Sequence, residues 1–443
     1  MAQASSLTPN KDRTNKDRAT RGALSNWWLR ARTCPFWMVT IAFALRLAYI
    51  VLAHTYKFKP DQNDFGFGYE MGRIGHAIAT GRGFADPFGP MTGPTAWEPP
   101  LYPYLIASVF KLSGIYTHAS AFILLTINSV FSALTCIPIF LIARKCFGEK
   151  VAVWSAWAWA LLPTVMYWST RWVWETSLAA LLLAVIFWLT LELEELNGLT
   201  PWIGFGLLWG VAAMTNTSLI SFLPASGLWV WYRRWKAGTP SLAGVALASV
   251  FFVAAIAPWL VRNYEAFGKF VFIRSNFGAE LRLGNGPGAD GTWMSYLHPT
   301  QNSLALQQYE QMGETDYIAE RKREAMDFIR ADYGRFAWIS FQRFVYYWAG
   351  RPRSSEMSAL VDNSAFFASS ILAFWGLGRA LRKRQPGAGL FFCLAVSYPT
   401  IYYFVYPHSR YRHPIEPVMA ILIAYVISEA GTKHVDNLRD KVS

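Results

Sequence analysis

Residues 241–261 read SLAGVALASVFFVAAIAPWLV and contain no charged side chain. A helix needs about 20 mostly apolar residues to cross the hydrocarbon core of a bilayer, so this stretch predicts a membrane-spanning helix. Similar runs recur along a chain of 443 residues that is 53% hydrophobic and 16% charged. Soluble proteins carry about 25% charged residues. The sequence therefore predicts an all-α integral membrane protein.

Apolar runs of this kind predict a polytopic helix bundle of about ten spans, within a range of about nine to twelve because run ends shift by a few residues. The predicted spans are residues 36–54, 118–143, 151–167, 176–192, 201–217, 219–232, 241–261, 363–379, 388–405 and 414–430.

The placement of Lys and Arg orients these spans. Cytoplasmic loops carry an excess of both residues, and basic residues fill the tail at 1–35 and the loops at 144–150, 233–236 and 379–384. We therefore expect both termini to be cytoplasmic and the first span to be retained, since no cleavage site follows it. The loop at 193–200 is acidic and departs from this pattern.

The net charge of +13 comes from 41 basic and 28 acidic residues. Basic loops beside anionic lipid account for it better than nucleic-acid binding does. The four cysteines are far apart and form no CxxC pair, which disfavours a disulfide framework and a thiolate metal site. They are Cys34, Cys136, Cys146 and Cys393.

Two long polar segments, 55–117 and 262–362, fall on the outer side in this topology. Within them, PPLYPYLIASVFKLSG predicts an interfacial or re-entrant helix, 302–333 one or two amphipathic helices, and 336–350 a helix at the interface. The predicted organisation is a tail at 1–35, a bundle at 36–261 with a catalytic outer loop at 55–117, an outer region at 262–362, further spans at 363–430 and a tail at 431–443.

The first outer segment carries acidic residues close to the first span. Asp61 and Asp64 follow that span by a few residues, within a glycine-rich stretch that runs to residue 104. A carboxylate there can act as general base toward a hydroxyl. A helix-capping Asp in an ordinary loop is the alternative.

The second candidate cluster, residues 258–285, lies at the end of the seventh span. Guanidinium groups bind phosphate by charge-assisted hydrogen bonds, and the alternative is snorkelling toward lipid headgroups. The polar residues of this cluster are Arg262, Asn263, Arg274, Asn276 and Asn285.

A third cluster is the short outer turn at 406–419, which contains His408, Arg410, Arg412 and His413. The positive-inside rule does not place basic residues there. An anionic ligand is therefore a better explanation than chance.

A fourth, smaller cluster is STRWVWET at 169–176, with Arg171 and Glu175. A ligand site and an Arg–Glu pair packed inside the bundle remain equal alternatives.

Several of these motifs resemble the GT-C superfamily of membrane glycosyltransferases. They are NDFGFGYEMGRIGHAIATGRGF at 63–84, GPTAWEPPLYPYL at 93–105, the RNY…FG…IRSN…GN run, and RYRHPIEP at 410–417. The likeness extends over most of residues 36–430. It is greatest for the bacterial group related to protein O-mannosyltransferases (glycosyltransferase family 39) and to lipid A aminoarabinose transferases.

The resemblance implies transfer of a sugar from a polyprenyl-phosphate carrier to an acceptor hydroxyl on a protein, lipid or polysaccharide, with inversion. It assigns the catalytic base to Asp64, with Asp61 as a near alternative and Glu70 as a contributor. Relatives often carry a second acidic residue directly after the first, whereas this chain has Phe65. No compact ligand set predicts a metal, so no cofactor is expected.

The remaining site residues follow from the same resemblance. Arg410, Arg412 and either Arg262 or Arg274 would stabilise charge on the leaving phosphate. Aromatic side chains could stack on the sugar, although packing is the alternative for each. The full substrate-binding prediction is Trp97, Glu98, Tyr102, Arg171, Glu175, Arg262, Arg274, Asn276, Asn285, Arg410, Arg412 and His413, with Trp172 and Trp174 as further stacking candidates.

Two other functions remain open. A transporter or flippase would place polar residues at mid-membrane depth, and a glycan ligase or polymerase would use much the same chemistry on a lipid-linked glycan. The expected location is a bacterial inner membrane, with the active site at the periplasmic face.

Overall fold

The computed structural model describes residues 33–351 and 357–442, and side chains in these ranges except at 357–362 and 431–442. All regular elements within these ranges are helices. Extended pairing in the same ranges is limited to one isolated bridge between Ala85 and Pro94. The prediction of an all-α fold is confirmed.

Five helical segments are long and apolar enough to cross a membrane, and they coincide with predicted spans. The chain is therefore a multi-pass membrane protein. The five segments are Pro35–Leu52 (α2), His118–Phe147 (α5, His118–Leu134, with α6, Cys136–Phe147), Leu242–Phe267 (α12), Asn363–Arg382 in α17 (Met357–Arg382) and Ser409–Ala430, which includes most of the apolar part of α21 (Glu416–Val442).

The other predicted spans also fall on helices, but these helices are shorter than a full crossing. The number of crossings therefore stays a prediction. The shorter helices are α7 (Glu149–Leu161), α8 (Pro163–Arg171), α9 (Thr176–Glu192), α10 (Thr200–Thr215), α11 (Leu223–Lys236), α18 (Ala388–Ser397) and α19 (Thr400–Phe404).

Small residues let α10 and α12 pack closely. A Cβ on Gly206 would lie 2.2 Å from the carbonyl oxygen of Ala248, and a Cβ on Gly210 would lie 2.4 Å from the Cβ of Ala255. Gly206 and Gly210 are four residues apart and form a GxxxG motif, the pattern that brings helix backbones together in membranes. Close backbone packing therefore fixes α10 against α12.

The loops predicted to be cytoplasmic meet at one end of the bundle. Lys145 lies 3.4 Å from Glu192, and Arg233 lies 2.8 Å from Glu194. Glu192 and Glu194 belong to or adjoin the acidic loop that departs from the positive-inside pattern. These ion pairs explain why that loop is acidic, because its carboxylates neutralise basic residues of neighbouring turns.

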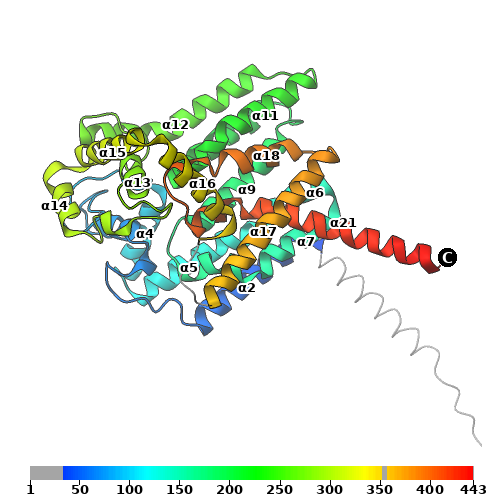
Figure 1. Ribbon diagram of the computed structural model, residues 1–443, viewed down its shortest axis with the longest axis horizontal. Helices are drawn as coiled ribbons and strands as arrows, with labels where there is room; N and C mark the ends of the chain where they lie inside the picture. The colour runs from blue at the N-terminus through cyan, green and yellow to red at the C-terminus, as the bar shows by residue number, and fades with distance from the viewer. Residues whose placement is uncertain (1–32, 352–356, 443) are drawn as a thin grey trace, which may run out of the picture.

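The two outer segments form helices at the other end, away from the end where α21 leaves the bundle (Figure 1). The predicted amphipathic helices are confirmed as α14 (Ser303–Met312) and α15 (Glu314–Ala331). The remaining helices there are α3 (Glu70–Ala79), α4 (Leu101–Ser113), α13 (Phe277–Gly284) and α16 (Tyr333–Ala349).

The helix predicted over 336–350 falls within α16. Trp338 and Phe341 are exposed, whereas Arg343 is fully buried. The Nη1 atom of Arg343 donates to the carbonyl oxygen of Phe404 at 2.8 Å and to Oδ1 of Asn285 at 3.2 Å. Arg343 thus joins α16 to α13 and α19, and the position of α16 at a membrane interface stays a prediction.

Replacing Gly206 with Ala should destabilise the bundle, because its Cβ meets the backbone of α12 and overpacking costs about 1–3 kcal/mol. Thermal unfolding in detergent should show a lower midpoint. Gly204→Ala on the same helix is the matched control, since a Cβ there meets nothing within 4 Å. Equal midpoints for the two variants would contradict this account of the packing.

Candidate active site

The loop that carries Asp61 and Asp64 is held by its own backbone. Asp64 accepts hydrogen bonds from the N–H groups of Lys59 and Gly66, each at 2.7 Å. It thereby caps the short helix η1 (Phe65–Phe67). Asp61 accepts from the N–H of Asn63 at 3.0 Å. Asp64 therefore has the capping role given above as the alternative, whereas Asp61 only closes a turn within the loop. A catalytic role stays open for both acids.

This loop docks on the segment between α8 and α9. The N–H of Val173 donates to the carbonyl oxygen of Gly66 at 2.9 Å, and the ring of Phe65 lies 4.7 Å from that of Trp172. Gly68 has a φ of +83°, and a Cβ on it would lie 2.4 Å from the carbonyl oxygen of Val173. Only glycine fits this contact.

Trp174, the residue after Val173 in that segment, packs against Arg410. The guanidinium carbon of Arg410 lies 3.7 Å from the ring centroid of Trp174, and Nη2 donates to the hydroxyl of Tyr411 at 3.4 Å. Its Nη1 atom is buried and has no hydrogen-bond partner. Arg410 is thus held by an aromatic face with one donor group left over.

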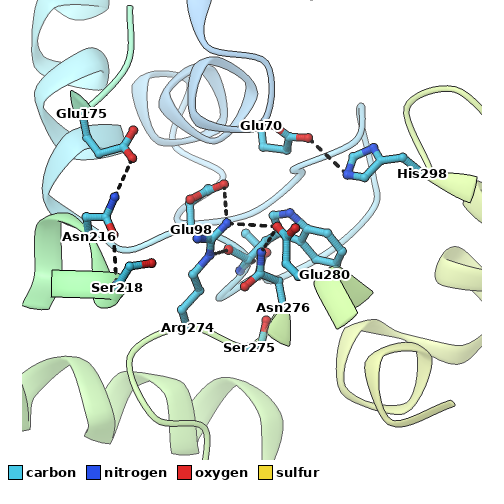
Figure 2. Close-up of polar contacts among 12 residues, drawn as sticks. Glu70, Glu98, Glu175, Asn216, Ser218, Arg274, Ser275, Asn276, Glu280 and His298 are labelled. Atoms are coloured by element: carbon cyan, nitrogen blue, oxygen red, sulfur yellow. Dashed lines mark hydrogen bonds and ion pairs between the residues drawn. The ribbon is translucent and has the colours of Figure 1, made fainter. Parts of the chain in front are cut away.

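Glu175 directly follows Trp174 and occupies the N-cap position of α9, although its side chain makes no capping hydrogen bond there. Its Oε1 accepts from Asn216 at 3.0 Å, a contact visible in Figure 2. Its Oε2 is buried and unpartnered. Arg171 turns elsewhere and donates to the hydroxyl of Tyr49 at 3.1 Å, so Arg171 and Glu175 each have a different partner.

A second charged group surrounds Arg274 (Figure 2). Its Nε donates to the carbonyl oxygen of Trp97 at 2.7 Å, and its Nη2 lies 3.0 Å from Glu98 and 3.5 Å from Glu280. Glu280 also accepts from Asn276 at 2.7 Å and from the hydroxyl of Tyr406. These contacts join the first outer loop, α13 and the segment before α20 (Ser409–Arg412).

Glu98 has a strongly perturbed pKa. Burial raises it to about 8; Arg274 opposes the rise, and the nearby carboxylates of Glu70 and Glu175 add to it. Perturbed carboxylates cluster at functional sites. Glu98 is therefore a further candidate residue of the site.

Glu70 stands at the start of α3, and its Oε1 lies 3.4 Å from Nε2 of His298 (Figure 2). Burial lowers the pKa of His298, although Glu70 and Glu280 oppose that shift. Sequence analysis missed His298, which no local motif distinguishes. It also missed Glu280, although its spacing of four residues from Asn276 is a detectable helical pair.

Glu314 joins the two outer segments through hydrogen bonds. It is buried, and it accepts hydrogen bonds from the N–H of Ala96 at 2.7 Å, from Ser275 and Tyr309 at 2.8 Å each, and from Thr95. Burial raises its pKa. Because all these partners donate, Glu314 fixes residues 95–96, next to Glu98, relative to α15.

Arg262 has a similar role. Its Nη1 donates to the carbonyl oxygen of Thr95 at 2.6 Å and its Nη2 to that of Phe84 at 2.7 Å. It therefore ties the first outer loop to the end of α12. The phosphate-binding role predicted for Arg262 gains no support from these contacts.

Arg412 and His413 are engaged within the bundle. Arg412 is 4% exposed, and its Nη1 donates to the carbonyl oxygen of Phe366 and to Ser370, each at 3.0 Å. Nδ1 of His413 lies 2.7 Å from Glu416, and its ring stacks on another aromatic ring. These two residues join helices, although Nε2 of His413, like Nη1 of Arg410, is buried without a hydrogen-bond partner. Arg410 is the arginine of this turn with a spare donor.

Three further predicted ligands also have internal partners. Asn285 donates to the carbonyl oxygens of Leu281 at 2.8 Å and Phe404 at 2.9 Å. The hydroxyl of Tyr102 donates to Asn128 at 2.8 Å. Trp97 is 1% exposed and packs among aromatic rings. Packing, the alternative stated for Trp97 and Tyr102, accounts for both.

Within residues 33–351 and 357–442, no group of three or more His, Cys, Asp or Glu side chains is arranged to hold a metal ion. Metal independence remains a prediction.

Comparisons with known proteins bear on this arrangement. The family model described as dolichyl-phosphate-mannose-protein mannosyltransferase matches residues 97–261. No curated protein sequence matches the chain. The oligosaccharyltransferase of Archaeoglobus fulgidus in the apo form superposes with a TM-score of 0.55 at 14% identity, covering 92% of this chain and 52% of that one.

Two other solved structures are similar. The A. fulgidus oligosaccharyltransferase AglB in complex with an inhibitory peptide and a dolichol-phosphate gives a TM-score of 0.54 at 14% identity, covering 92% of this chain and 52% of that one. ArnT from Cupriavidus metallidurans bound to undecaprenyl phosphate gives 0.36 at 14% identity, covering 88% and 77%; a score this low carries no argument about the fold.

The present chain spans about half the length of the archaeal enzymes. Their similarity and the family match confirm the predicted resemblance at the level of the fold. This chain has the fold of the GT-C superfamily of membrane glycosyltransferases.

Replacing Glu98 with Gln should remove a pH dependence of stability. Between the ordinary glutamate pKa of 4.5 and its folded value of about 8, folded Glu98 keeps a proton that the unfolded chain has lost. Wild-type stability should therefore fall as pH rises through this window. The difference in unfolding midpoint between Glu98→Gln and wild type should grow in favour of the variant from about pH 5 to about pH 8.5.

Glu310→Gln serves as the control, because Glu310 is exposed on α14. Its midpoint should follow that of the wild type at each pH. If Glu98→Gln also followed the wild type throughout, the proposed protonation of Glu98 in the folded state would be wrong.

Proposed function

We propose that this protein is a membrane glycosyltransferase that moves a sugar from a polyprenyl-phosphate-linked donor to an acceptor hydroxyl with inversion. One observation carries the proposal. The loop of Asp64 is hydrogen-bonded to the segment 172–174, and Trp174 of that segment supports Arg410. A carboxylate and a guanidinium with a spare donor are thus connected through one segment of the fold, which supports a shared site.

Asp64 is the proposed general base. Each of its carboxylate oxygens accepts one backbone N–H, and an ionised carboxylate has about four acceptor positions. Lone pairs therefore remain for the proton of an acceptor hydroxyl. Asp61 in the same loop and Glu70 at the start of α3 are the alternative acids.

Arg410 is the proposed ligand of the donor phosphate. Its Nη1 is unpartnered, whereas Arg412 and Arg262 donate to internal carbonyl groups. Arg274 is paired with Glu98 and Glu280. A leaving phosphate beside Arg410 would gain the charge-assisted hydrogen bonds that stabilise developing negative charge.

The proposed reaction is a single displacement. The acceptor oxygen forms a bond to the anomeric carbon as the bond from that carbon to the phosphate oxygen breaks. The electron pair leaves with the polyprenyl phosphate, and the proton of the acceptor hydroxyl passes to Asp64. Attack opposite the leaving group inverts the anomeric centre.

The arrangement of polar groups disfavours a transporter or flippase, because Glu70, Glu98, Arg274 and Glu280 contact one another or His298 within the outer segments. The helices α13, α14 and α15 of these segments lie at one end of the bundle (Figure 1). A ligase or polymerase that moves a whole glycan would use the same base and phosphate contacts, and only the donor would differ. We place the protein in a bacterial inner membrane, with both termini cytoplasmic and the site at the periplasmic face.

Asp64→Asn should abolish sugar transfer, because Asn keeps the size of Asp but cannot take a proton. The amide retains one of the two backbone N–H contacts of Asp64, so the unfolding midpoint of the variant should be measured beside its activity. Purified protein should be incubated with radiolabelled polyprenyl-phospho-sugars and candidate acceptors. A parallel Asp61→Asn variant tests the alternative base. Asp332→Asn is the control, since Asp332 also caps a helix, α16, by accepting a backbone N–H. Full transfer by Asp64→Asn would refute the assignment.

Arg410→Ala should weaken binding of a polyprenyl phosphate by roughly 1.5–3 kcal/mol, the range for hydrogen bonds to charged groups. Binding can be measured by calorimetry in nanodiscs, independently of turnover. Arg144→Ala is the control, because Arg144 also packs on an aromatic ring, 5.4 Å from the centroid of Phe140, but belongs to a predicted cytoplasmic turn. If Arg410→Ala bound the polyprenyl phosphate as tightly as the wild type, Arg410 would not be a phosphate ligand and would serve only in packing.

A further inference from the structure

The residues on both sides of Asp64 are attached to one arginine. Nη2 of Arg73, in α3, donates to Oδ1 of Asn63 at 2.9 Å. The guanidinium carbon of Arg73 lies 5.0 Å from the ring centroid of Tyr69, whose ring lies 4.6 Å from that of Phe65. Asn63 directly precedes Asp64, and Phe65 directly follows it. Arg73 is therefore connected to the chain immediately before and immediately after the proposed base.

The contact with Asn63 extends further into the acidic loop. Nδ2 of Asn63 donates to Oδ1 of Asp61 at 3.2 Å, and the backbone N–H of Asn63 donates to the same oxygen at 3.0 Å. The N–H of Asp64 in turn donates to the carbonyl oxygen of Asp61 at 3.0 Å. The side chain of Asn63 thus holds the turn that leads into Asp64, and Arg73 holds that side chain.

Tyr69 makes the other connection from a strained backbone. It occupies the N-cap position of α3 with a φ of +45°, a conformation that side chains larger than glycine rarely adopt. In this conformation its ring meets both Arg73 and Phe65. Backbone strain of this kind costs free energy and is concentrated at functional sites. The contacts of Tyr69 therefore point to a functional reason for its conformation.

Burying Arg73 also costs the fold free energy. The residue is 5% exposed, and its Nε and Nη1 atoms are buried without a hydrogen-bond partner. A buried charge is unfavourable when its donors are left unpaired. Exchanging buried ionic groups for well-packed apolar residues is often neutral or stabilising. Stability alone therefore gives no reason for an arginine at this position.

We propose that Arg73 is a positioning residue, which fixes Asp64 for proton transfer by holding the residues on either side of it. This inference rests on the proposed role of Asp64 as general base. Such a base must lie within about 2.6–3.2 Å of the oxygen that it deprotonates. A small displacement of a reacting group can cost about a hundredfold in rate. Arg73 acts through the loop and does not itself contact the substrate.

The first test is the kinetics of Arg73→Met, which removes the charge and the hydrogen bond but keeps an unbranched side chain. In nanodiscs, kcat for sugar transfer should fall roughly tenfold to a hundredfold. KM for the polyprenyl-phospho-sugar should not change, because Arg410 is untouched. The unfolding midpoint should be equal or higher, whereas loss of a merely structural arginine would lower it. Arg73→Lys should restore most of kcat, because an ammonium group can donate to Asn63.

Hydrogen exchange tests the same inference without turnover. The N–H groups of Lys59 and Gly66 are bonded to Asp64, so their exchange reports how firmly the loop is held. Peptides that cover residues 59–66 should exchange roughly tenfold faster in Arg73→Met, because a hydrogen bond from a charged group is lost. Asn63→Ala should have a similar effect. The double variant should show less than the product of the two single effects, because both substitutions remove the same contact.

Arg234→Met is the matched control for removing a buried arginine. Arg234 is 8% exposed and donates to the carbonyl oxygens of Leu193 and Leu196, at the predicted cytoplasmic end. Its unfolding midpoint should fall because these carbonyl groups lose a donor. Below that midpoint, kcat and the exchange of residues 59–66 should equal those of the wild type.

Wild-type exchange or wild-type kcat in Arg73→Met would overturn the positioning role, as would an equal loss of kcat in Arg234→Met. Absence of sugar transfer by the wild type would overturn the proposed function instead. The exchange measurement would then decide by itself whether Arg73 holds the loop.

Discussion

The hydrogen bond from Val173 to Gly66 is the contact on which the arrangement of the site depends. It places the acidic loop that follows α2 on the segment between α8 and α9, and the close approach at Gly68 leaves no room for a side chain. The following residue, Trp174, then carries Arg410 from the other end of the chain. Three segments far apart in the sequence thus meet through one backbone contact and one aromatic face.

Buried polar contacts fix the rest of the outer end around this junction. Glu314 accepts hydrogen bonds from both outer segments, and Arg262 binds two carbonyl groups of the first. Hydrogen bonds of this kind are strong where water is excluded. The residues next to Glu98 are therefore held by groups that do not need a ligand to be ordered.

The helices could be predicted from the sequence because long apolar runs leave few alternatives, and α9 has the predicted bounds of 176–192. The number of membrane crossings could not be predicted with the same certainty, since helices such as α7 and α10 are too short to cross the bilayer alone. The acidic loop at 193–200 departs from the charge pattern of the sequence, but in the structure Glu194 pairs with Arg233 of a neighbouring basic turn. Arg233 is 39 residues away from Glu194, and no local pattern reveals such a pair.

The same limit applies to the site. The sequence located four polar clusters, and the structure brings residues of all four to one end of the bundle. The sequence could not show that Arg410 and Arg412, only two residues apart, have different roles. Arg412 turns toward Phe366 and Ser370 in α17, whereas Arg410 turns toward Trp174. That difference depends on which helix each side chain faces after packing, and a charge pattern carries no such information.

Some buried groups at this end have no partner in the protein, and a ligand could contribute a contact to them. Glu314, Glu280 and Arg274 have partners for the groups that they bury. Nη1 of Arg410 and Oε2 of Glu175 do not. Unpaired buried charge is costly, so a ligand that supplies a partner to these two groups would be bound more tightly. Arg410 packs on the ring of Trp174, and Glu175 is the next residue of the same segment. The loop of Asp64 docks on this segment, which is why the phosphate and the acceptor hydroxyl are proposed to meet there.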